Sequence, residues 1–183
     1  PLPARRAAQL TMCLGLAAVD GIADVTGLAP RLKWPNDLLW EGRKLGGMLT
    51  ELRLTGEQIE YAVLGLGINV NVRFDLAAAA PTELVATATS LQMATGRPVA
   101  RAALLAAIVR RCEAWYDRLL AGESLHEAWA DRLDTLGREV RISLPTAELQ
   151  GVAARITPEG ALVVRTVAGQ EEIVWAGDVY TVR

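Results

Sequence analysis

Histidine and cysteine are scarce in this sequence of 183 residues, and their scarcity excludes several kinds of site. The one histidine, His126, stands in an amphipathic segment, where a solvated or helix-capping role is favoured over a metal ligand or a general base. With no second histidine and no close cysteine pair, the sequence offers nothing that could build a zinc site. Cys13 and Cys112 each lie in an apolar helical pattern, which predicts buried, reduced thiols and a cytoplasmic protein.

Long runs of one residue type are also missing. The chain has 19 basic and 21 acidic residues, and no run of lysine or arginine exceeds two, so nothing indicates a nucleic-acid-binding surface. No segment reaches the roughly 18 consecutive apolar residues of a membrane span, and no charged-then-apolar leader opens the chain. A hydrophobic fraction of 51% with 22% charged residues is the balance of a globular protein, long enough for one sizeable domain and a smaller one.

A polar stretch, Lys-Trp-Pro-Asn-Asp at residues 33–37, is the first candidate for a functional site. Its proline fixes its own φ and biases the preceding tryptophan toward extended backbone, so the chain enters Asn36 and Asp37 in a near-rigid conformation. The residues that follow predict a β-hairpin, which brings Lys44 back near this acidic end. We expect its first strand, turn and second strand at residues 38–40, 41–42 and 44–52.

A third segment, residues 61–71, alternates strictly in side-chain size. Leucine, isoleucine and valine from Leu64 to Val70 fall on one side, which predicts a face that packs on a core. The other side is nearly bare backbone ending in amides, and it would let a flat ligand lie close to the sheet. Its members are Gly65, Gly67, Asn69 and Asn71. Taken alone, Gly-Leu-Gly could equally be a packing point beneath a helix.

Three ordered motifs resemble the biotin protein ligase family, the biotin–[acetyl-CoA-carboxylase] ligases. They are Lys-Trp-Pro-Asn-Asp at residues 33–37, Arg-Lys-Leu-Gly-Gly at 43–47 and Gly-Leu-Gly-Ile-Asn-Val-Asn at 65–71. Each would be a weak signal alone, but three in order over about forty residues are specific. The resemblance extends to the end of the chain. It implies an α/β (α+β) fold, with the helix-flanked mixed sheet of the biotin/lipoate ligase catalytic domain and a small C-terminal SH3-like β-barrel.

The resemblance also implies a reaction. Members of the family activate the carboxylate of biotin with ATP, forming biotinyl-5′-AMP and pyrophosphate. They then pass the acyl group to a lysine of the biotin carboxyl carrier protein of acetyl-CoA carboxylase. Because an anion attacks a polyanion, such a site needs positioning and positive charge more than an activated serine or cysteine. The implied ligands are therefore biotin, ATP and Mg²⁺.

Roles for individual residues follow from the same resemblance. Lys44 matches the family's essential lysine, which contacts both the biotin carboxylate and the α-phosphate. Glycines would let the biotin rings and acyl chain approach the backbone; they are Gly47, Gly65 and Gly67. Polar residues would form the nucleotide side, where Mg²⁺ is held through phosphates. They are Asn36, Asp37 and Asn69, with Asp37 also a candidate for orienting either the metal or the family's arginine-rich loop.

The residues themselves leave other roles open. Lys44 could be a solvated hairpin lysine, Asp37 could be a turn or cap residue, and Lys33 could merely pair with an acid. Trp34 is expected to pack in the core in preference to stacking on biotin.

Helical and strand patterns divide the remaining chain at Gly137. Apolar residues at helical spacing predict three helices, with an irregular segment at residues 73–84. The helices are expected at residues 4–21, 100–120 and 125–133. Beyond Gly137, short alternating segments separated by turns predict a small β module. Its strands are expected at residues 138–144, 149–156, 161–167 and 171–175, so the domains are residues 1–135 and 137–183.

The family's glycine- and arginine-rich loop, which covers biotin and the adenylate, is expected upstream of the helix at residues 4–21. No such segment stands there. The sequence therefore predicts a chain that begins inside the catalytic domain and has weak activity alone, as a monomer or homodimer. Some members carry an N-terminal DNA-binding repressor domain, and this sequence does not show whether the protein has one. Two alternatives stay open: a lipoate-type ligase, and a non-catalytic module that binds biotin or the carrier protein.

Overall fold

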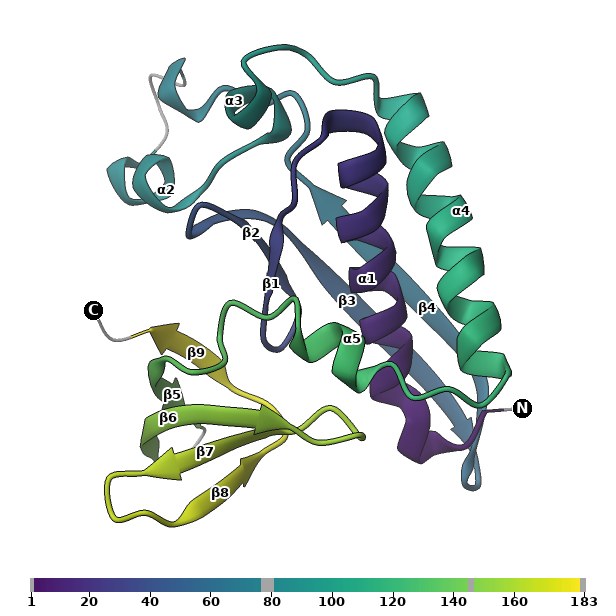
Figure 1. Cartoon of the computed structure of the whole chain (residues 1–183), viewed down its shortest axis with the longest axis vertical. Coiled ribbons are helices and arrows are strands. Elements are labelled where there is room, and N and C mark those ends of the chain that lie inside the picture. The colour runs from purple at the N-terminus through teal and green to yellow at the C-terminus, as the bar shows by residue number, and fades with distance from the viewer. Residues whose placement is uncertain (1, 77–80, 145–146, 182–183) are drawn as a thin grey trace.

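The structure is a computed structural model, and it describes residues 2–76, 81–144 and 147–181. A long helix is followed by four strands and then by further helices, and from Glu139 onward the chain is formed by strands (Figure 1). The α-helices are α1 (Ala7–Thr26), α2 (Thr82–Thr87), α3 (Leu91–Thr95), α4 (Arg101–Leu120) and α5 (His126–Ala130), and short 3₁₀ helices are η1 (Ala4–Arg6) and η2 (Phe74–Leu76). The strands are β1 (Arg31–Lys33), β2 (Asp37–Trp40), β3 (Arg43–Thr55), β4 (Gln58–Ile68), β5 (Glu139–Ser143), β6 (Glu148–Ile156), β7 (Leu162–Thr166), β8 (Glu171–Val174) and β9 (Asp178–Thr181).

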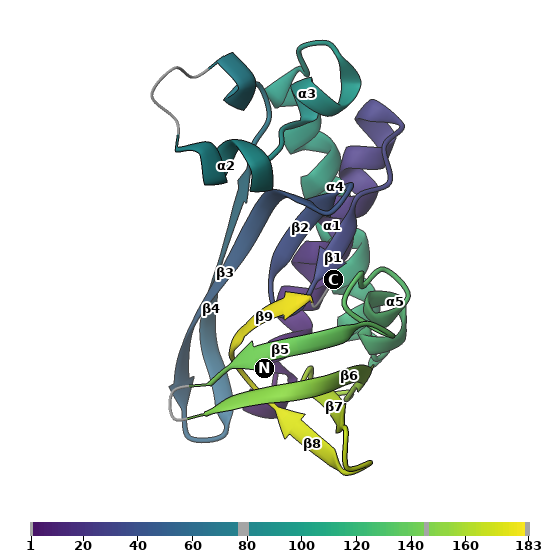
Figure 2. The same cartoon turned by 90° about the vertical axis from the view of Figure 1, so that its left-hand side faces the viewer.

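The first four strands form one sheet in the order β1-β2-β3-β4, and every neighbouring pair is antiparallel. Parallel pairing is confined, among the described residues, to isolated bridges at Leu32–Leu133 and Lys44–Ala88, whereas a mixed sheet was expected. Helices α1 and α4 run side by side on one side of β3 and β4 (Figures 1 and 2). The opposite face of this hairpin is open, because several of its large side chains, such as Leu49 and Val63, are exposed.

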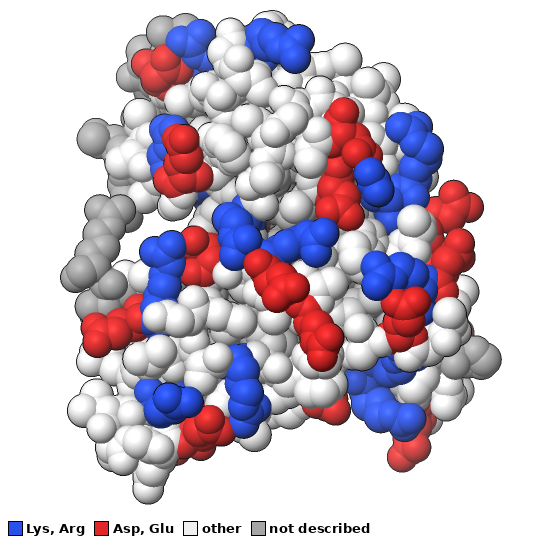
Figure 3. All heavy atoms as spheres, viewed as in Figure 1, with Lys and Arg blue, Asp and Glu red and all other residues white. Residues whose placement is uncertain are grey.

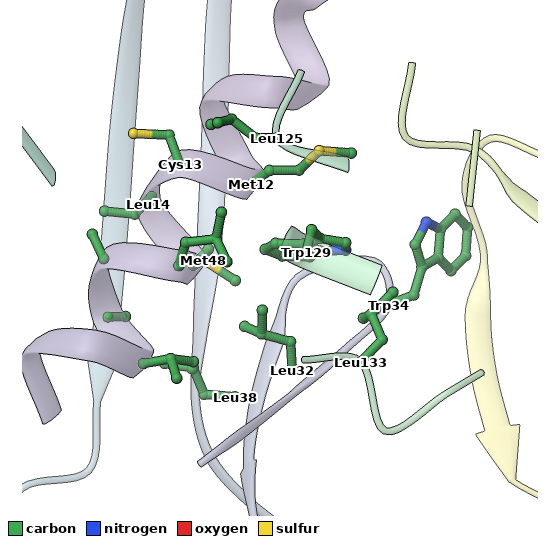
Figure 4. Close-up of a cluster of buried hydrophobic side chains, with 14 of the residues drawn as sticks. Met12, Cys13, Leu14, Leu32, Trp34, Leu38, Met48, Leu125, Trp129 and Leu133 are labelled. Carbon is green, nitrogen blue, oxygen red and sulfur yellow. The ribbon is translucent and has the colours of Figure 1, made fainter. Parts of the chain in front are cut away.

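Helix α1 is the centre of the core. It contacts α4, β3, β4 and α5, and most of its residues from Gln9 to Ile22 are buried. Figure 4 shows Met12 and Met48 close to Trp129, whereas Cys13 and Leu14 point away from it on another side of α1. The segment Ala4–Thr26 is long and apolar enough to cross a membrane by composition, but 67% of its most apolar window is buried inside the protein, as expected for the core helix of a globular domain.

Strands β5 to β9 form a second antiparallel sheet in the order β8-β7-β6-β5-β9. Its outer strands, β8 and β9, are not hydrogen-bonded to each other among the described residues, so the sheet is an open form of the expected small barrel. Its core is formed by inward-facing aliphatic residues at alternating positions, as the sequence pattern predicts. They include Val140, Ile142, Ala153, Leu162, Val164 and Val179.

The second sheet is docked against α1 and the segment around Trp34 through hydrogen bonds. The indole N–H of Trp34 donates to the carbonyl of Gly160 at 2.9 Å, and the Gln9 side chain donates to the carbonyl of Pro158 at 3.2 Å. On the connecting segment, the Thr135 hydroxyl accepts a hydrogen bond from the backbone N–H of Trp34 at 3.0 Å. A Cβ at Gly160 would lie 2.7 Å from the Cβ of Ala8, so the turn and α1 are in close contact.

Most predicted elements are confirmed, with differences at their ends and some elements that were not predicted. The first helix continues five residues beyond the predicted end to Thr26, where Gly27 in the left-handed region ends it. The segment at residues 73–84, predicted as irregular, contains η2 and the start of α2, and residues 77–80 lie outside the described part. Strand β9 was not predicted. Acidic and basic side chains intermingle on the face drawn in Figure 3.

Candidate active site

Strand β3 carries a β-bulge where it returns from the hairpin turn. Its pairing with β2 skips Leu45, which lies as an extra residue between Lys44 and Gly46. In a regular strand, Lys44 and Gly47 would point to opposite faces. The extra residue places them on the same face, and a Cβ at Gly47 would lie 3.7 Å from the Cε of Lys44.

Lys44 forms an ion pair with Asp37 on this face. Its Nζ lies 2.7 Å from Oδ1 of Asp37, with the two side chains 55% and 22% exposed. The same carboxylate oxygen is 3.1 Å from the position of a Cβ at Gly47, so the ion pair lies beside that glycine. A half-exposed pair adds little to stability. Because the Lys44 side chain is half exposed, its ammonium is accessible to an anion that reaches this end of the sheet.

Three glycines continue the open face from this ion pair, and we call Gly47, Gly65 and Gly67 the glycine lane. Gly47 pairs with Gly67 across β3 and β4, and Gly65 pairs with Leu49. A Cβ at Gly65 or Gly67 would meet no atom closer than 3.7 Å, so the lane is open above the backbone. Leu49 and Val63 flank it with exposed apolar side chains. A flat, largely apolar ring system could lie on this surface with its acidic end at Lys44.

The predicted amides are used partly to hold the backbone. The Asn36 side chain donates to the carbonyl of Met48 at 2.6 Å, and the N–H of Met48 donates to the carbonyl of Asn36 at 2.8 Å. Asn69 lies just beyond β4, where its side chain donates to the carbonyl of Thr89 at 3.0 Å. The segment held by Asn69 borders Lys44, because the N–H of Thr89 donates to the Lys44 carbonyl at 2.9 Å. The two amides therefore fix backbone on either side of this lysine.

Other residues considered from the sequence have structural roles. Asn71 bonds both backbone groups of Val99, each at 2.9 Å, and so closes the loop before α4. Trp34 is 3% exposed and belongs to the core, which confirms its expected packing role. His126 is the first residue of α5, and its Nδ1 hydrogen-bonds the Ser124 hydroxyl at 2.9 Å; the N-cap is Leu125, so the histidine side chain does not cap the helix.

A hollow of about 180 Å³ joins the ion pair to the second sheet. It is lined by Lys33–Asp37, Lys44 and residues Asp178, Val179 and Tyr180 of β9. This volume is below the roughly 300 to 1,000 Å³ of enclosed ligand pockets. The hollow is therefore one end of a site whose other part is the open glycine lane.

Sequence reasoning missed several residues of this region. Asp178 and Tyr180 carry no motif and reach the site only because β9 folds against it. Gly46 has a packing signal that alternation could not reveal: a Cβ there would collide with the carbonyl oxygen of Gly67. Thr89 is fully buried, and its hydroxyl has no hydrogen-bond partner among the described residues.

The donor set fits a magnesium ion held through phosphates. The described residues contain no group of three or more histidine, cysteine or acidic side chains that could enclose a metal. Two acidic residues, Asp37 and Asp178, are among those that line the hollow. One or two carboxylates, together with substrate phosphates and water, are the usual ligands of Mg²⁺.

Comparison with known proteins identifies the family of this chain. A profile of the biotin/lipoate A/B protein ligase family matches residues 2–69, and a profile of the biotin protein ligase C-terminal domain matches residues 135–181. A biotin–[acetyl-CoA-carboxylase] ligase of Paracoccus denitrificans is 32% identical over 171 residues, which are 91% of this chain and 70% of that protein. The chain belongs to the biotin protein ligase family.

Other relatives agree with this membership. The bifunctional ligase/repressor BirA of Bacillus subtilis is 32% identical over 94% of this chain, and the chain spans 53% of that protein. The biotin protein ligase of Aquifex aeolicus in its apo structure superposes with a TM-score of 0.79 at 25% identity, over 97% of this chain and 76% of that one. A structure of the Aquifex aeolicus enzyme in complex with biotin and ATP gives a TM-score of 0.76 at 26% identity, covering 96% and 72% of the two chains. The expected α+β ligase fold is thus confirmed.

Proposed function

We propose that this chain is the catalytic portion of an ATP-dependent biotin protein ligase. It would activate biotin to biotinyl-5′-AMP and transfer the biotinyl group to a lysine of the biotin carboxyl carrier protein of acetyl-CoA carboxylase. The observation that carries the proposal is the position of Lys44, whose ammonium is paired with Asp37 at the open end of the glycine lane. Family relatives named for this reaction support it.

The chemistry assigned to these residues is positioning and charge neutralisation. Biotin would lie on Gly47, Gly65 and Gly67, with its carboxylate directed at Lys44. In the adenylation step, a carboxylate oxygen attacks the α-phosphorus, a new P–O bond forms, and the bond to pyrophosphate breaks. Lys44 would stabilise the negative charge that develops on the α-phosphate, and such contacts in sites of this kind are worth roughly 3 to 4 kcal/mol. Asp37 would orient the lysine before ligands arrive.

The nucleotide would occupy the hollow beside β9. Asn36, Asp37 and Asp178 are among the residues that line it. Asn69 supports it indirectly, because it holds the Thr89 segment that bonds the Lys44 carbonyl. Bound Mg²⁺ would neutralise the phosphates there, with Asp37 and Asp178 as its protein ligands. The two-domain division at residues 1–135 and 137–183 is part of the proposal, supported by the C-terminal profile match and by the separate second sheet.

We further propose a cytoplasmic protein that acts as a monomer or homodimer and uses no nucleic acid or membrane through this chain. Cys13 and Cys112 are free thiols and not joined in a disulfide. This supports a cytoplasmic location, because cysteines there are normally reduced.

The deciding experiment measures pyrophosphate release by the gene product that contains this chain. Biotin and lipoate are compared at matched concentrations with ATP and Mg²⁺, and transfer to purified carrier protein is followed in parallel. We expect turnover with biotin to exceed that with lipoate. Equal or greater turnover with lipoate would favour the lipoate-type alternative. Biotin binding without any pyrophosphate release would favour a non-catalytic binding module.

A further inference from the structure

The two cysteines, far apart in sequence, meet between the two core helices. Cys13 on α1 is 1% exposed, and its Sγ lies 3.6 Å from the backbone carbonyl oxygen of Cys112 on α4. The helices approach to backbone contact nearby, since a Cβ on Gly21 would lie 2.9 Å from the backbone N of Ile108. The Cys13 sulfur thus lies against the backbone of Cys112, where the helices are packed closely enough for the two side chains to meet.

Both thiols border a groove that opens to solvent. The groove has a volume of about 1050 Å³ and lies between α1, β4 and α4. Cys13 forms part of its floor, whereas Cys112 is partly exposed along its wall. A small oxidant that enters the groove therefore reaches Cys112 before it reaches Cys13.

The two thiols differ in how readily they ionise. The pKa of Cys112 is lowered to about 7, because a hydrogen bond from Cys13 stabilises its thiolate more than burial disfavours it. The same hydrogen bond, together with burial, raises the pKa of Cys13. The accessible Cys112 thiol thus ionises more readily than its buried partner, which keeps the proton. Thiolates are the reactive form toward oxidants.

We propose that Cys13 and Cys112 form a hydroperoxide-sensitive dithiol that closes to a disulfide between α1 and α4. Nothing in the biotin ligase chemistry of the opposite sheet face requires this pair, so the proposal stands independently of the proposed function. The ligand class is a small hydroperoxide, with hydrogen peroxide as the simplest member.

The reaction has two balanced steps. The Cys112 thiolate attacks one peroxide oxygen, the O–O bond breaks, and hydroxide leaves, so sulfur is oxidised to a sulfenic acid and the peroxide is reduced. The Cys13 sulfur then attacks the Cys112 sulfur as its own proton passes to the departing oxygen, so the S–S bond forms and the S–O bond breaks with loss of water. In total, two thiols and one peroxide give one disulfide and two waters.

The test treats the reduced, folded chain with equimolar hydrogen peroxide and then alkylates all remaining thiols. Intact mass and a non-reducing peptide map report the products, and thermal unfolding is compared before and after treatment. We expect a monomer that has lost two hydrogens, a linked pair of peptides carrying Cys13 and Cys112, and a higher Tm, because the cross-link closes a long loop. A reducing dithiol should reverse all three changes.

Three outcomes would overturn the proposal. They are two alkylatable thiols after treatment, a disulfide between two copies of the chain, and sulfinic acid on Cys112 with Cys13 still free. Single variants test the order of the steps in parallel, after circular dichroism has confirmed their folding. Cys13→Ala should accumulate a sulfenic acid at Cys112 that dimedone traps, and Cys112→Ser should leave Cys13 reduced. Oxidation of Cys13 in Cys112→Ser at the wild-type rate would contradict the assigned roles.

Discussion

At the scale of single residues, Lys44 is the group on which the proposed chemistry depends most. Lys44→Gln keeps a donor and most of the length but removes the charge. The side chain is half exposed, so the fold should be unaffected, whereas adenylate formation should fall by roughly 10² to 10³. The measurement is pyrophosphate release at saturating biotin and ATP.

A matched control comes from the far end of the same strand. Arg53 is also an exposed cation paired with a carboxylate, Glu60, at 3.2 Å. Arg53→Gln should retain wild-type turnover. Activity of Lys44→Gln within threefold of wild type would remove Lys44 from the mechanism.

At the scale of elements, two glycines of the β3–β4 hairpin differ in the space around them. Gly46 is needed for packing, because a Cβ there would collide with the β4 backbone, so Gly46→Ala should lower the free energy of unfolding by about 1 to 3 kcal/mol. Gly67 faces open space, so Gly67→Val should fold normally and yet fill the glycine lane. We expect Gly67→Val to lose biotin binding by isothermal titration calorimetry.

The neighbouring Val63 supplies a comparison on the same exposed face. Val63→Ile adds a methylene outside the lane and should bind biotin as the wild type does. Tight biotin binding by a folded Gly67→Val variant would show that biotin does not lie on these glycines.

The α1–α4 helix pair carries an acid-sensitive contact. Arg111 donates to both carboxylate oxygens of Asp24, at 2.8 and 2.7 Å, and this hydrogen bonding holds the pKa of Asp24 below its ordinary value of 3.8. A folded-state pKa below the unfolded value gives stability that is present above the unfolded pKa and lost as pH falls through the folded pKa. Because the pair is exposed, its contribution should be small and sensitive to salt.

Asp24→Asn tests this contact. Its Tm should lie slightly below that of the wild type at neutral pH, and the two should converge as the pH falls below 3.8. Thermal unfolding across this range at low ionic strength is the measurement. A Tm difference that persists unchanged in acid would mean that the carboxylate charge is not its cause.

At the scale of the whole molecule, a strand of the second sheet completes the hollow beside the Lys44–Asp37 ion pair. Asp178 and Tyr180 of β9 line the hollow beside Asp37, away from the glycine lane. Asp178→Asn and Tyr180→Ala should therefore raise the KM for ATP several-fold and leave the KM for biotin nearly unchanged. Steady-state kinetics with each substrate varied in turn would check this.

The docking contacts provide the control for that pair of variants. Gln9→Met removes the hydrogen bond to the Pro158 carbonyl but keeps the length of the side chain, and Gln9 does not line the hollow. It should therefore cost about 1 kcal/mol of stability without a selective effect on ATP. If Asp178→Asn and Tyr180→Ala change both KM values equally, the second domain acts on the site only through stability.

The sequence by itself determined the elements and the family. Helical spacing in α1 and α4, alternation in β4, and three ordered motifs are local properties, so they can be read without knowing which segments meet. They predicted the hairpin, the small β module and the candidate residues from Asn36 to Asn69. The sequence pattern also anticipated Trp34 as a packing residue.

Only the tertiary structure decided how those residues are combined. The bulge at Leu45 reverses the facing of Lys44 relative to the rest of β3, and strict alternation cannot predict an extra residue that depends on pairing with β2. Strand β9 reaches the site, and Cys13 meets Cys112, through contacts between segments separated by about a hundred residues or more. Such contacts depend on the packing of whole elements, because that packing is set by burial of many side chains at once and not by any short pattern.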